Sequence, residues 1–370
     1  MATALKNIVV VGGSYVGHSS AKELASVIPP AYRVLLIEPH SHFHHMFFFP
    51  RFAIVPGQEH KAFIPYSNIF SSVPNSASHA VAQARVLSIQ PSYVKLDREW
   101  QGSTRIPFEY LAVATGTRLA EPAGMRDDDK VSSVAYLRKH QADVKRSQSI
   151  LIVGGGAVGV QMATDLKEFY PEKEVTVVQS QPRVMPQFHE RLHDIVKKRF
   201  DELGVRLITG SRIVIPPSGF RNDGSIFNVQ LTNGTEVSTQ FVILATGQTP
   251  NNGLLNDLPP SRPDSLINPD NGFIRVKPTM QLLDERYPNV FAVGDIADTG
   301  ARKAARWGAA QGAVVAKNIK ALIEGKQPTE EYRPQPSGIH LTLGLRRSIK
   351  FFNPDVAGGQ KEPRYTEQHE

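Results

Sequence analysis

Two glycine-rich segments constrain the fold of this chain most strongly, because each follows a short apolar run and precedes a helical pattern. The first is Lys6–Gly17 (KNIVVVGGSYVG) and the second is Ser149–Gly159 (SILIVGGGAVG). Both continue to a second apolar run, Tyr32–Glu38 and Glu174–Gln179. This order of strand, glycine turn, helix and strand is typical of a parallel βαβ unit. The sequence therefore predicts an α/β protein with two Rossmann-like, doubly wound domains.

Other segments agree with this plan. Apolar spacing predicts helices over Ala157–Phe169 and from Leu192 to Leu203, the second ended by Gly204. An Ala-rich helix is expected over Ala304–Ile323, and a hairpin around Asn233-Gly234.

The second glycine cluster is a complete G-x-G-x-x-G motif, formed by Gly154, Gly156 and Gly159. Its glycines permit a tight turn, close approach of the backbone to a pyrophosphate, and close packing of the helix on the strand. The N-terminus of the following helix favours negative charge. We expect a dinucleotide here; the alternative is a purely structural turn.

The first cluster departs from the motif at one position, because Ser14 stands where the middle glycine is usual. Its Cβ would press toward a pyrophosphate, but its hydroxyl can also donate a hydrogen bond to one. Glu38 ends the next apolar run and is placed to accept hydrogen bonds from both hydroxyls of an adenosine ribose. Nucleotide binding is therefore expected at this cluster too.

The second unit has no acid at the matching place, since its strand ends at Gln179 and Arg183 follows closely. Without a carboxylate, a 2′-phosphate is not repelled, and Arg183 can pair with it. We expect NADPH to be accepted at least as well as NADH. The alternative is that Arg183 is only solvated and the site prefers neither nucleotide.

The segment Phe291–Asp295 ends in Gly294-Asp295 shortly before the Ala-rich helix. Such a turn can present Asp295 to sugar or ribityl hydroxyls and aim the helix N-terminus at an anion. Asp295 can equally be an ordinary turn residue.

The chain has no cysteine, which excludes a disulfide framework, a cysteine nucleophile and a dithiol redox pair, but not redox chemistry carried by an organic cofactor. Its net charge of +7 is compatible with anionic cofactors, an anionic membrane or simply a solubilising surface. No recognition helix accompanies this charge, so no specific nucleic acid is expected. A peripheral membrane contact through Arg346, Arg347 and Lys350, beside Phe351 and Phe352, competes with a solvated face.

The N-terminus lacks a charged and apolar secretory pattern, and Ala2 excludes N-myristoylation. No apolar run reaches the roughly 18 residues of a spanning helix. The expected location is intracellular, either cytoplasmic or peripheral on an organelle membrane, and not secreted.

A histidine- and phenylalanine-rich stretch runs from His40 to Phe49. Its spacing matches no zinc pattern and lacks nearby acidic or cysteine ligands, so no metal site is expected. It is interpreted either as a packed segment with aromatic faces for a planar acceptor or as plain core, built on His40, His42, Phe43, His44, His45, Phe47, Phe48 and Phe49.

Together these features resemble the pyridine-nucleotide flavoprotein superfamily with two dinucleotide-binding domains. The resemblance rests on the two Rossmann units, on Ala114–Gly116 and Ala245–Gly247 (both ATG), and on Gly294-Asp295. Three closer matches resemble the apoptosis-inducing-factor-like branch, which includes the ferroptosis suppressor proteins, NAD(P)H:quinone reductases: Ser41–His45 (SHFHH), Ile64–Ser67 (IPYS) and Tyr170–Thr176 (YPEKEVT).

The resemblance implies an FAD-binding domain over residues 1–118 and 248–326, an inserted NAD(P)H-binding domain over 119–247, and a short C-terminal segment over 327–370. It implies that flavin-centred chemistry needs no side-chain acid or base, and that Lys303 lies near the flavin end. The residues it places at FAD are Gly12, Gly13, Ser14, Tyr15, Val16, Gly17, Glu38, Arg51, Val86, Thr115, Gly116 and Asp295.

The expected activity is transfer of hydride from NAD(P)H through FAD to a quinone-like acceptor. One alternative is a flavin oxidase or dehydrogenase of a dedicated small metabolite. Another is a DNA-binding protein of the apoptosis-inducing-factor kind. The chain departs from the family at Ser14, and its match is loose after Leu345, so the acceptor is the least constrained part of this interpretation.

Overall fold

The computed structural model describes residues 4–303 and 305–369, which group into two compact units. Unit 1 combines the chain up to His44 with Phe63–Arg118 and Thr249–Gln335. Unit 2 combines His45–Ala62, Leu119–Gln248 and the chain from Pro336. Each unit holds one glycine-rich segment on a parallel sheet, which confirms the predicted α/β class with two Rossmann-like folds. The assignment of a cofactor to each unit stays a prediction.

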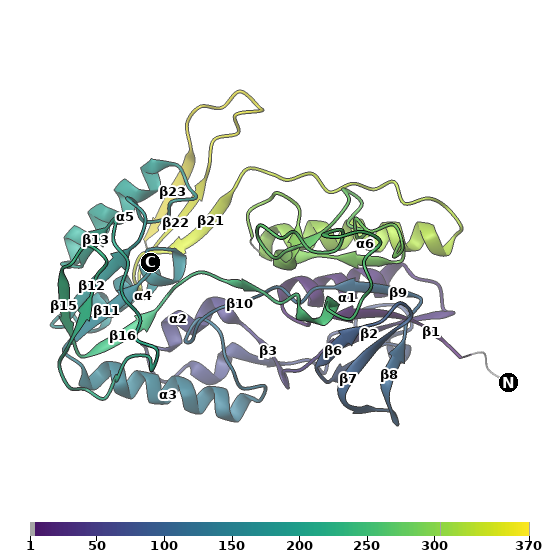
Figure 1. The fold of residues 1–370 in the computed structure, drawn as a ribbon, viewed down its shortest axis with the longest axis horizontal. Helices are drawn as coiled ribbons and strands as arrows, with labels where there is room; N and C mark the ends of the chain where they lie inside the picture. The colour runs from purple at the N-terminus through teal and green to yellow at the C-terminus, as the bar shows by residue number, and fades with distance from the viewer. Residues whose placement is uncertain (1–3, 304, 370) are drawn as a thin grey trace. The chain divides into compact units, whose positions relative to one another are not determined.

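A five-stranded parallel sheet forms the centre of unit 1 (Figure 1). Five of the six residues of its central strand are buried, as expected for a parallel strand covered on both faces. In spatial order the strands are β19 (Val290–Ala292), β9 (Tyr110–Val113), β1 (Lys6–Val11), β2 (Tyr32–Glu38) and β5 (Ala80–Gln83).

Helices α1 (Tyr15–Val27) and α6 (Ala305–Ile323) lie side by side on one side of this sheet (Figure 1). They approach closely because a Cβ atom at Gly312 would lie only 2.5 Å from the Ser20 hydroxyl. Helix α6 is the predicted Ala-rich helix; its first predicted residue, Ala304, lies outside the described residues.

An antiparallel meander lies on the other side of the sheet (Figure 1). It consists of β6 (Val86–Ile89), β7 (Tyr93–Trp100) and β8 (Ser103–Pro107). Short pairs complete unit 1: β3 (His42–His44) with β4 (Phe63–Pro65), β10 (Thr117–Arg118) with β17 (Thr249–Pro250), and β18 (Ile274–Arg275) with β20 (Ala297–Asp298). Its 3-10 helices are η3 (Ser76–Ser78), η4 (Gly253–Leu255) and η5 (Gly294–Ile296).

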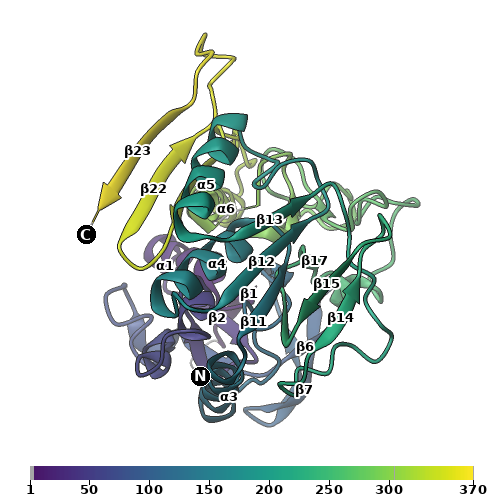
Figure 2. The ribbon, with the colours of Figure 1, turned by 90° about the vertical axis from the view of Figure 1, so that its left-hand side faces the viewer.

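A four-stranded parallel sheet forms the centre of unit 2, in the order β13 (Arg206–Thr209), β12 (Glu174–Gln179), β11 (Ser149–Val153) and β16 (Phe241–Leu244). The predicted hairpin, β14 (Phe227–Gln230) and β15 (Glu236–Thr239), covers one face through a buried apolar cluster. Helices α4 (Ala157–Phe169) and α5 (Glu190–Leu203) lie on the other side (Figure 2).

The helix ends of unit 2 follow from local chemistry. The Asp129 carboxylate accepts a hydrogen bond from the Ser132 N–H at 2.8 Å and so caps α3 (Lys130–Arg146). Gly204 ends α5 in the left-handed conformation, with φ of 70°, which a glycine adopts without steric cost. The two predicted helix ends, Phe169 and Gly204, are both confirmed.

The C-terminal segment adds a three-stranded antiparallel sheet to unit 2, made of β21 (Gly338–Thr342), β22 (Arg347–Phe352) and β23 (Arg364–His369). Phe351 is fully buried and packs edge-on against Phe188, while the Arg347 guanidinium pairs with Glu202 at 2.8 Å. These two residues of the suggested membrane contact therefore pack against other elements of unit 2. Unit 2 also contains η1 (Met46–Phe48), α2 (Phe49–Phe52) and η2 (Glu59–Ala62).

Across residues 4–303 and 305–369, no helix combines the length and the apolar character that crossing a membrane would require.

Candidate functional site

The first glycine loop connects β1 to α1 in a conformation that side chains would obstruct. Gly12 has a φ of 101°, and a Cβ atom there would lie 2.6 Å from the Ala114 carbonyl oxygen. A Cβ atom at Gly17 would overlap the Gly12 carbonyl oxygen. The backbone therefore turns tightly at the end of β1 and brings the N-terminus of α1 close to β9.

Ser14 caps α1 without strain, with φ of −71° and ψ of −167°. The matching residue of unit 2, Gly156, has nearly the same angles, and a Cβ atom there would meet no atom within 4 Å. The loop therefore accepts serine as readily as glycine at this position. Among the described residues the buried Ser14 hydroxyl has no hydrogen-bond partner, and it lies at the N-terminus of α1, where the helix dipole favours negative charge. This arrangement fits an anionic phosphate group.

Glu38 lies at the carboxyl end of β2 and is only 4% exposed. One of its carboxylate oxygens accepts a hydrogen bond from the Gly13 N–H, and the other accepts the His40 N–H at 3.0 Å. The His40 ring also pairs with Glu38. The carboxylate retains accepting capacity for ribose hydroxyls, so the loop and Glu38 fit a dinucleotide together.

Tyr15 and Val16 are the first two residues of α1, directly after the N-cap Ser14. Thr115 and Gly116 follow β9; the Thr115 hydroxyl donates to the Asn251 carbonyl at 2.8 Å, and the Asn251 N–H donates to the Gly116 carbonyl. Val86 begins β6 within the same unit. The structure thus places all the predicted FAD residues except Arg51 in unit 1.

Asp295 lies in η5, where burial raises the pKa of its carboxyl while Lys303 lowers it. The Lys303 ammonium donates to the Ala297 carbonyl and lies 3.8 Å from the centroid of the Phe273 ring. Burial lowers the pKa of Lys303. Sequence reasoning missed Gln311 of α6, whose side-chain oxygen accepts the Gly294 N–H at 2.7 Å and so fixes this turn; no sequence signal distinguished it from other polar residues of an amphipathic helix.

The second glycine loop repeats the geometry of the first. Gly154 has a φ of 113°, and a Cβ atom at Gly159 would overlap the Gly154 carbonyl oxygen. The Gln179 amide accepts the Gly155 N–H at 3.1 Å through its oxygen and donates to the Arg183 carbonyl at 3.1 Å. Gln179 therefore replaces Glu38 as a neutral group of nearly the same shape.

Arg183 lies at the surface of unit 2, where its side chain is 42% exposed. It pairs with Glu190, which is 70% exposed, at 3.3 Å. An ion pair this exposed is weak, so a phosphate can compete with Glu190 for the guanidinium.

Arg51 has a different environment from the other predicted FAD residues. It lies in α2 of unit 2, where its guanidinium makes two hydrogen bonds of 3.1 Å to Asp165 and one of 2.9 Å to the Gly344 carbonyl. Asp165 is completely buried, and burial raises the pKa of its carboxyl to about 6 even though Arg51 opposes this. A contact between Arg51 and FAD stays a prediction.

The histidine-rich stretch is not arranged as a metal centre: among the residues described, no group of three or more histidine or acidic side chains is placed to hold a metal ion. Burial lowers the pKa of His44 to about 3, so its imidazole stays neutral. Phe49 is fully buried, whereas Phe47 and Phe48 are 61% and 43% exposed.

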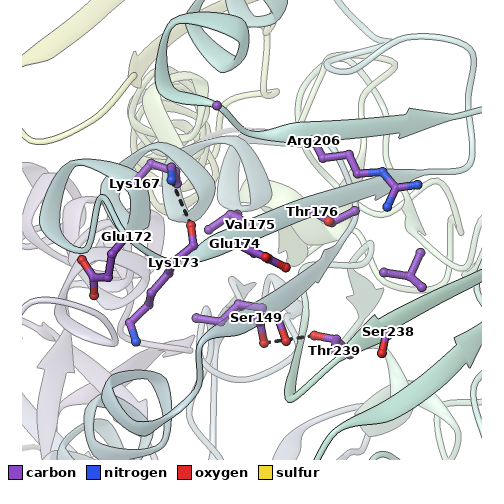
Figure 3. Close-up of a pocket in the computed structure, with 13 residues that line it drawn as sticks. Ser149, Lys167, Glu172, Lys173, Glu174, Val175, Thr176, Arg206, Ser238 and Thr239 are labelled. Carbon is purple, nitrogen blue, oxygen red and sulfur yellow. Dashed lines mark hydrogen bonds between the residues drawn. The ribbon is translucent and has the colours of Figure 1, made fainter.

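A pocket of about 300 Å³ opens at the amino ends of the unit 2 strands, away from the glycine loop at their carboxyl ends (Figure 3). Its two lysines already bind backbone carbonyls. The Lys173 ammonium donates to the Lys145 and Ser147 carbonyls at 2.9 and 2.6 Å, and the Lys167 ammonium donates to the Lys173 carbonyl at 2.9 Å. Burial lowers the pKa of Lys173. Lys173 thus holds the end of α3, and Lys167 holds the turn after α4.

Both glycine loops thus fit a dinucleotide, and the sequence of residues 6–315 matches the family described as pyridine nucleotide-disulphide oxidoreductases. The chain belongs to this family. Fe-regulated protein 8 of Mycosarcoma maydis is 36% identical over 366 residues, covering 93% of this chain and 88% of that protein. Ferroptosis suppressor protein 1 of Homo sapiens is 29% identical over 353 residues, covering 93% and 87%. The predicted apoptosis-inducing-factor-like membership is confirmed.

Solved structures share this fold at low sequence identity. The sulfide:quinone oxidoreductase of Aquifex aeolicus superposes with a TM-score of 0.73 at 19% identity, covering 98% of this chain and 87% of that chain. An engineered water-forming NADPH oxidase superposes with a TM-score of 0.70 at 19% identity, covering 94% and 75%. That oxidase is described as a mutant in which an aspartate is replaced by alanine and two arginines are introduced, among other changes.

Family and fold together make the chain an NAD(P)H-dependent flavoprotein oxidoreductase whose cofactors are FAD and NAD(P)H. The predicted enzyme class and cofactors are therefore confirmed.

Proposed function

We propose that the chain transfers the electrons of NAD(P)H to a quinone-like acceptor, with FAD held by unit 1 and NAD(P)H by unit 2. NAD(P)H, a quinone and a proton give NAD(P)⁺ and the hydroquinone. Bound FAD supplies the two-electron chemistry that links the two half-reactions. The protein's own contribution is to bind, orient and shield the reactants.

The assignment of the cofactors rests on the residues at the carboxyl ends of β2 and β12, which are Glu38 and Gln179. Glu38 offers a buried carboxylate to an adenosine ribose and would repel a 2′-phosphate, as suits FAD. Gln179 offers no charge, and Arg183 lies beside it. A nicotinamide nucleotide with or without a 2′-phosphate is therefore better suited to unit 2.

The acceptor proposal is carried by two exposed aromatic rings, Phe47 and Phe48, in a chain without cysteine. The Phe48 ring stacks on Phe52 with centroids 5.3 Å apart, and His45 lies 4.5 Å from Phe48. Large exposed rings of this kind favour a planar apolar ligand. The quinone in the name of the Aquifex aeolicus neighbour, and the resemblance to the apoptosis-inducing-factor-like branch, support the same class of acceptor.

Replacing both rings should weaken the quinone reaction alone. Phe47→Ala/Phe48→Ala is expected to raise KM for a short-chain ubiquinone about 10-fold, since each ring contributes apolar contact area. Reduction of ferricyanide, a small anionic acceptor, should keep its rate. Ile226→Ala, which removes another exposed apolar side chain of unit 2, is the matched control. An unchanged quinone KM, or quinone that fails to accelerate NADPH oxidation by the unmodified protein, would contradict the proposal.

Nucleotide choice should depend on Gln179. In the engineered NADPH oxidase an aspartate is removed and arginines are added, and this chain combines an uncharged Gln179 with Arg183. Gln179→Glu places a like charge next to a 2′-phosphate, and we expect the ratio of kcat/KM for NADPH over NADH to fall roughly 10-fold.

Arg183→Ala should lower the same ratio by reducing the NADPH value while sparing NADH. Arg206→Ala is the control, because Arg206 lies at the opposite end of the same sheet, by the pocket of Figure 3. Initial rates with both nucleotides at constant ionic strength measure the effect. Equal ratios for all three variants and the unmodified protein would show that neither Gln179 nor Arg183 sets the nucleotide preference.

A further inference from the structure

In both glycine loops the second glycine is held by hydrogen bonds at its N–H and at its carbonyl, although the residues that make these bonds differ. In unit 2 the Gly155 N–H donates to the Gln179 side chain at 3.1 Å. The Gly155 carbonyl accepts a hydrogen bond of 2.8 Å from the Met185 N–H, which lies in the turn that follows β12. The Gly155 peptide groups are therefore held from both sides by neighbours within unit 2.

In unit 1 a side chain, and not a backbone N–H, donates the hydrogen bond to the carbonyl of the second glycine. The Gly13 N–H donates to the Glu38 carboxylate, and the Gly13 carbonyl accepts the Tyr66 hydroxyl at 2.9 Å. The segment after β2 runs to the β3–β4 pair instead of turning back, and Tyr66 follows β4 directly. A phenol therefore takes the place of the backbone N–H that Met185 provides in unit 2.

The hydrogen bond from Tyr66 fixes the orientation of a whole peptide group and not only of the Gly13 carbonyl. The Gly13–Ser14 peptide is planar and trans, so its N–H points away from its carbonyl oxygen. Holding the Gly13 carbonyl on the Tyr66 side therefore turns the Ser14 N–H to the opposite side. Ser14 is the N-cap of α1, and its buried hydroxyl has no partner among the described residues. The Ser14 N–H, one of the donors that fit a pyrophosphate, thus belongs to a peptide whose orientation Tyr66 sets.

We propose that Tyr66 is a positioning residue for FAD: its hydroxyl holds the Gly13 carbonyl and so presents the Ser14 N–H to the pyrophosphate. The inference rests on the proposed assignment of FAD to unit 1. Tyr66 lies far from the glycine motif in the sequence and carries no part of it, and its role follows from the match between the two loops.

The surroundings of Tyr66 suit a permanent donor. Burial and the nearby Glu38 carboxylate raise the pKa of its phenol, so the proton stays on the oxygen throughout the working pH range. A Cβ atom at Gly13 would lie 2.9 Å from the Tyr66 oxygen and 3.0 Å from Glu38, so Tyr66 and Glu38 pack closely against this glycine.

The test is Tyr66→Phe, which removes only the hydroxyl. Apo-protein is titrated with FAD, and binding is followed by the change in flavin fluorescence. We expect the Kd for FAD to rise about 10-fold, the effect of losing one orienting hydrogen bond. The Kd for NADPH should not change, because Met185 performs the corresponding task in unit 2.

Tyr287→Phe is the matched control. The Tyr287 hydroxyl also donates to a backbone carbonyl of unit 1, that of Pro259 at 2.6 Å, but away from the glycine loop. Its removal should lower Tm as much as Tyr66→Phe without changing FAD affinity. An unchanged FAD Kd in Tyr66→Phe, or an equal increase in both variants, would overturn the positioning role. Failure of the unmodified apo-protein to bind FAD would instead overturn the assignment of FAD on which the inference rests.

Discussion

Gly159→Ala should abolish reduction of the flavin by NADPH or NADH while leaving FAD bound. The added Cβ atom would overlap the Gly154 carbonyl oxygen, so the glycine loop of unit 2 must open or α4 must shift. An overlap of this kind costs about 3 kcal/mol or more, which corresponds to at least roughly a 100-fold slower reduction at subsaturating nucleotide. Anaerobic stopped-flow absorbance of the oxidised flavin band measures the rate directly.

Gly17→Ala makes the same overlap in unit 1, with the Gly12 carbonyl oxygen. It should yield a protein that loses its flavin absorbance on purification yet still binds NADPH. Gly253→Ala is the control for replacing glycine, because a Cβ atom there would meet no atom within 4 Å. If Gly159→Ala lost FAD and Gly17→Ala kept it, the cofactors would be assigned to the wrong units.

Repetition within the sequence is what made the fold predictable. Strands β2 and β12 have the predicted bounds, and helix α4 has the predicted start and end, because continuous apolar runs and glycine turns are local signals. Glu38 and Gln179 end these strands as predicted, and each accepts the N–H of the second glycine of its loop; their roles toward a nucleotide stay predictions. The Ser14 substitution, which breaks the motif, proves sterically harmless because its φ of −71° is open to any residue.

Contacts between segments distant in sequence were not predictable in the same way. Tyr66 reaches the unit 1 glycine loop, and Gln311 of α6 reaches the Gly294 turn, although no periodicity in the sequence connects these residues. The partner of Arg51 was also hidden, because Asp165 has the spacing of an ordinary residue of α4. Such partners are brought together only by the tertiary fold, and no local pattern in the sequence identifies them.

Replacing Arg51 is the second change for which we expect a large effect, here on the stability of the fold. Its side chain is 23% exposed and pairs with an Asp165 carboxylate that is 0% exposed. Arg51→Met should lower the free energy of unfolding by about 3–5 kcal/mol, because it leaves a buried charge without a counter-ion. Lys197→Met, which breaks an exposed pair with Asp201, should cost no more than about 1 kcal/mol. Urea unfolding of the FAD-loaded protein gives both values.

The loss should depend on pH in a defined direction. The pKa of Asp165 in the folded protein is already raised to about 6, and removing Arg51 raises it further. A carboxyl with a raised folded pKa favours the folded state when it is protonated, and this contribution is lost as the pH rises through that pKa. The deficit of Arg51→Met should therefore be larger at pH 8 than at pH 5.5.

Asp165→Leu should restore most of the stability of Arg51→Met, since the double variant has no buried charge to compensate. The same proteins decide between the two roles of Arg51. If Arg51→Met unfolds at the urea concentration of the unmodified protein but binds FAD less tightly, then Arg51 acts on the cofactor, as its resemblance to the family implies. If stability falls and the Kd for FAD stays constant, Arg51 serves the interior of unit 2, where it joins α2 to α4 and to the Gly344 turn.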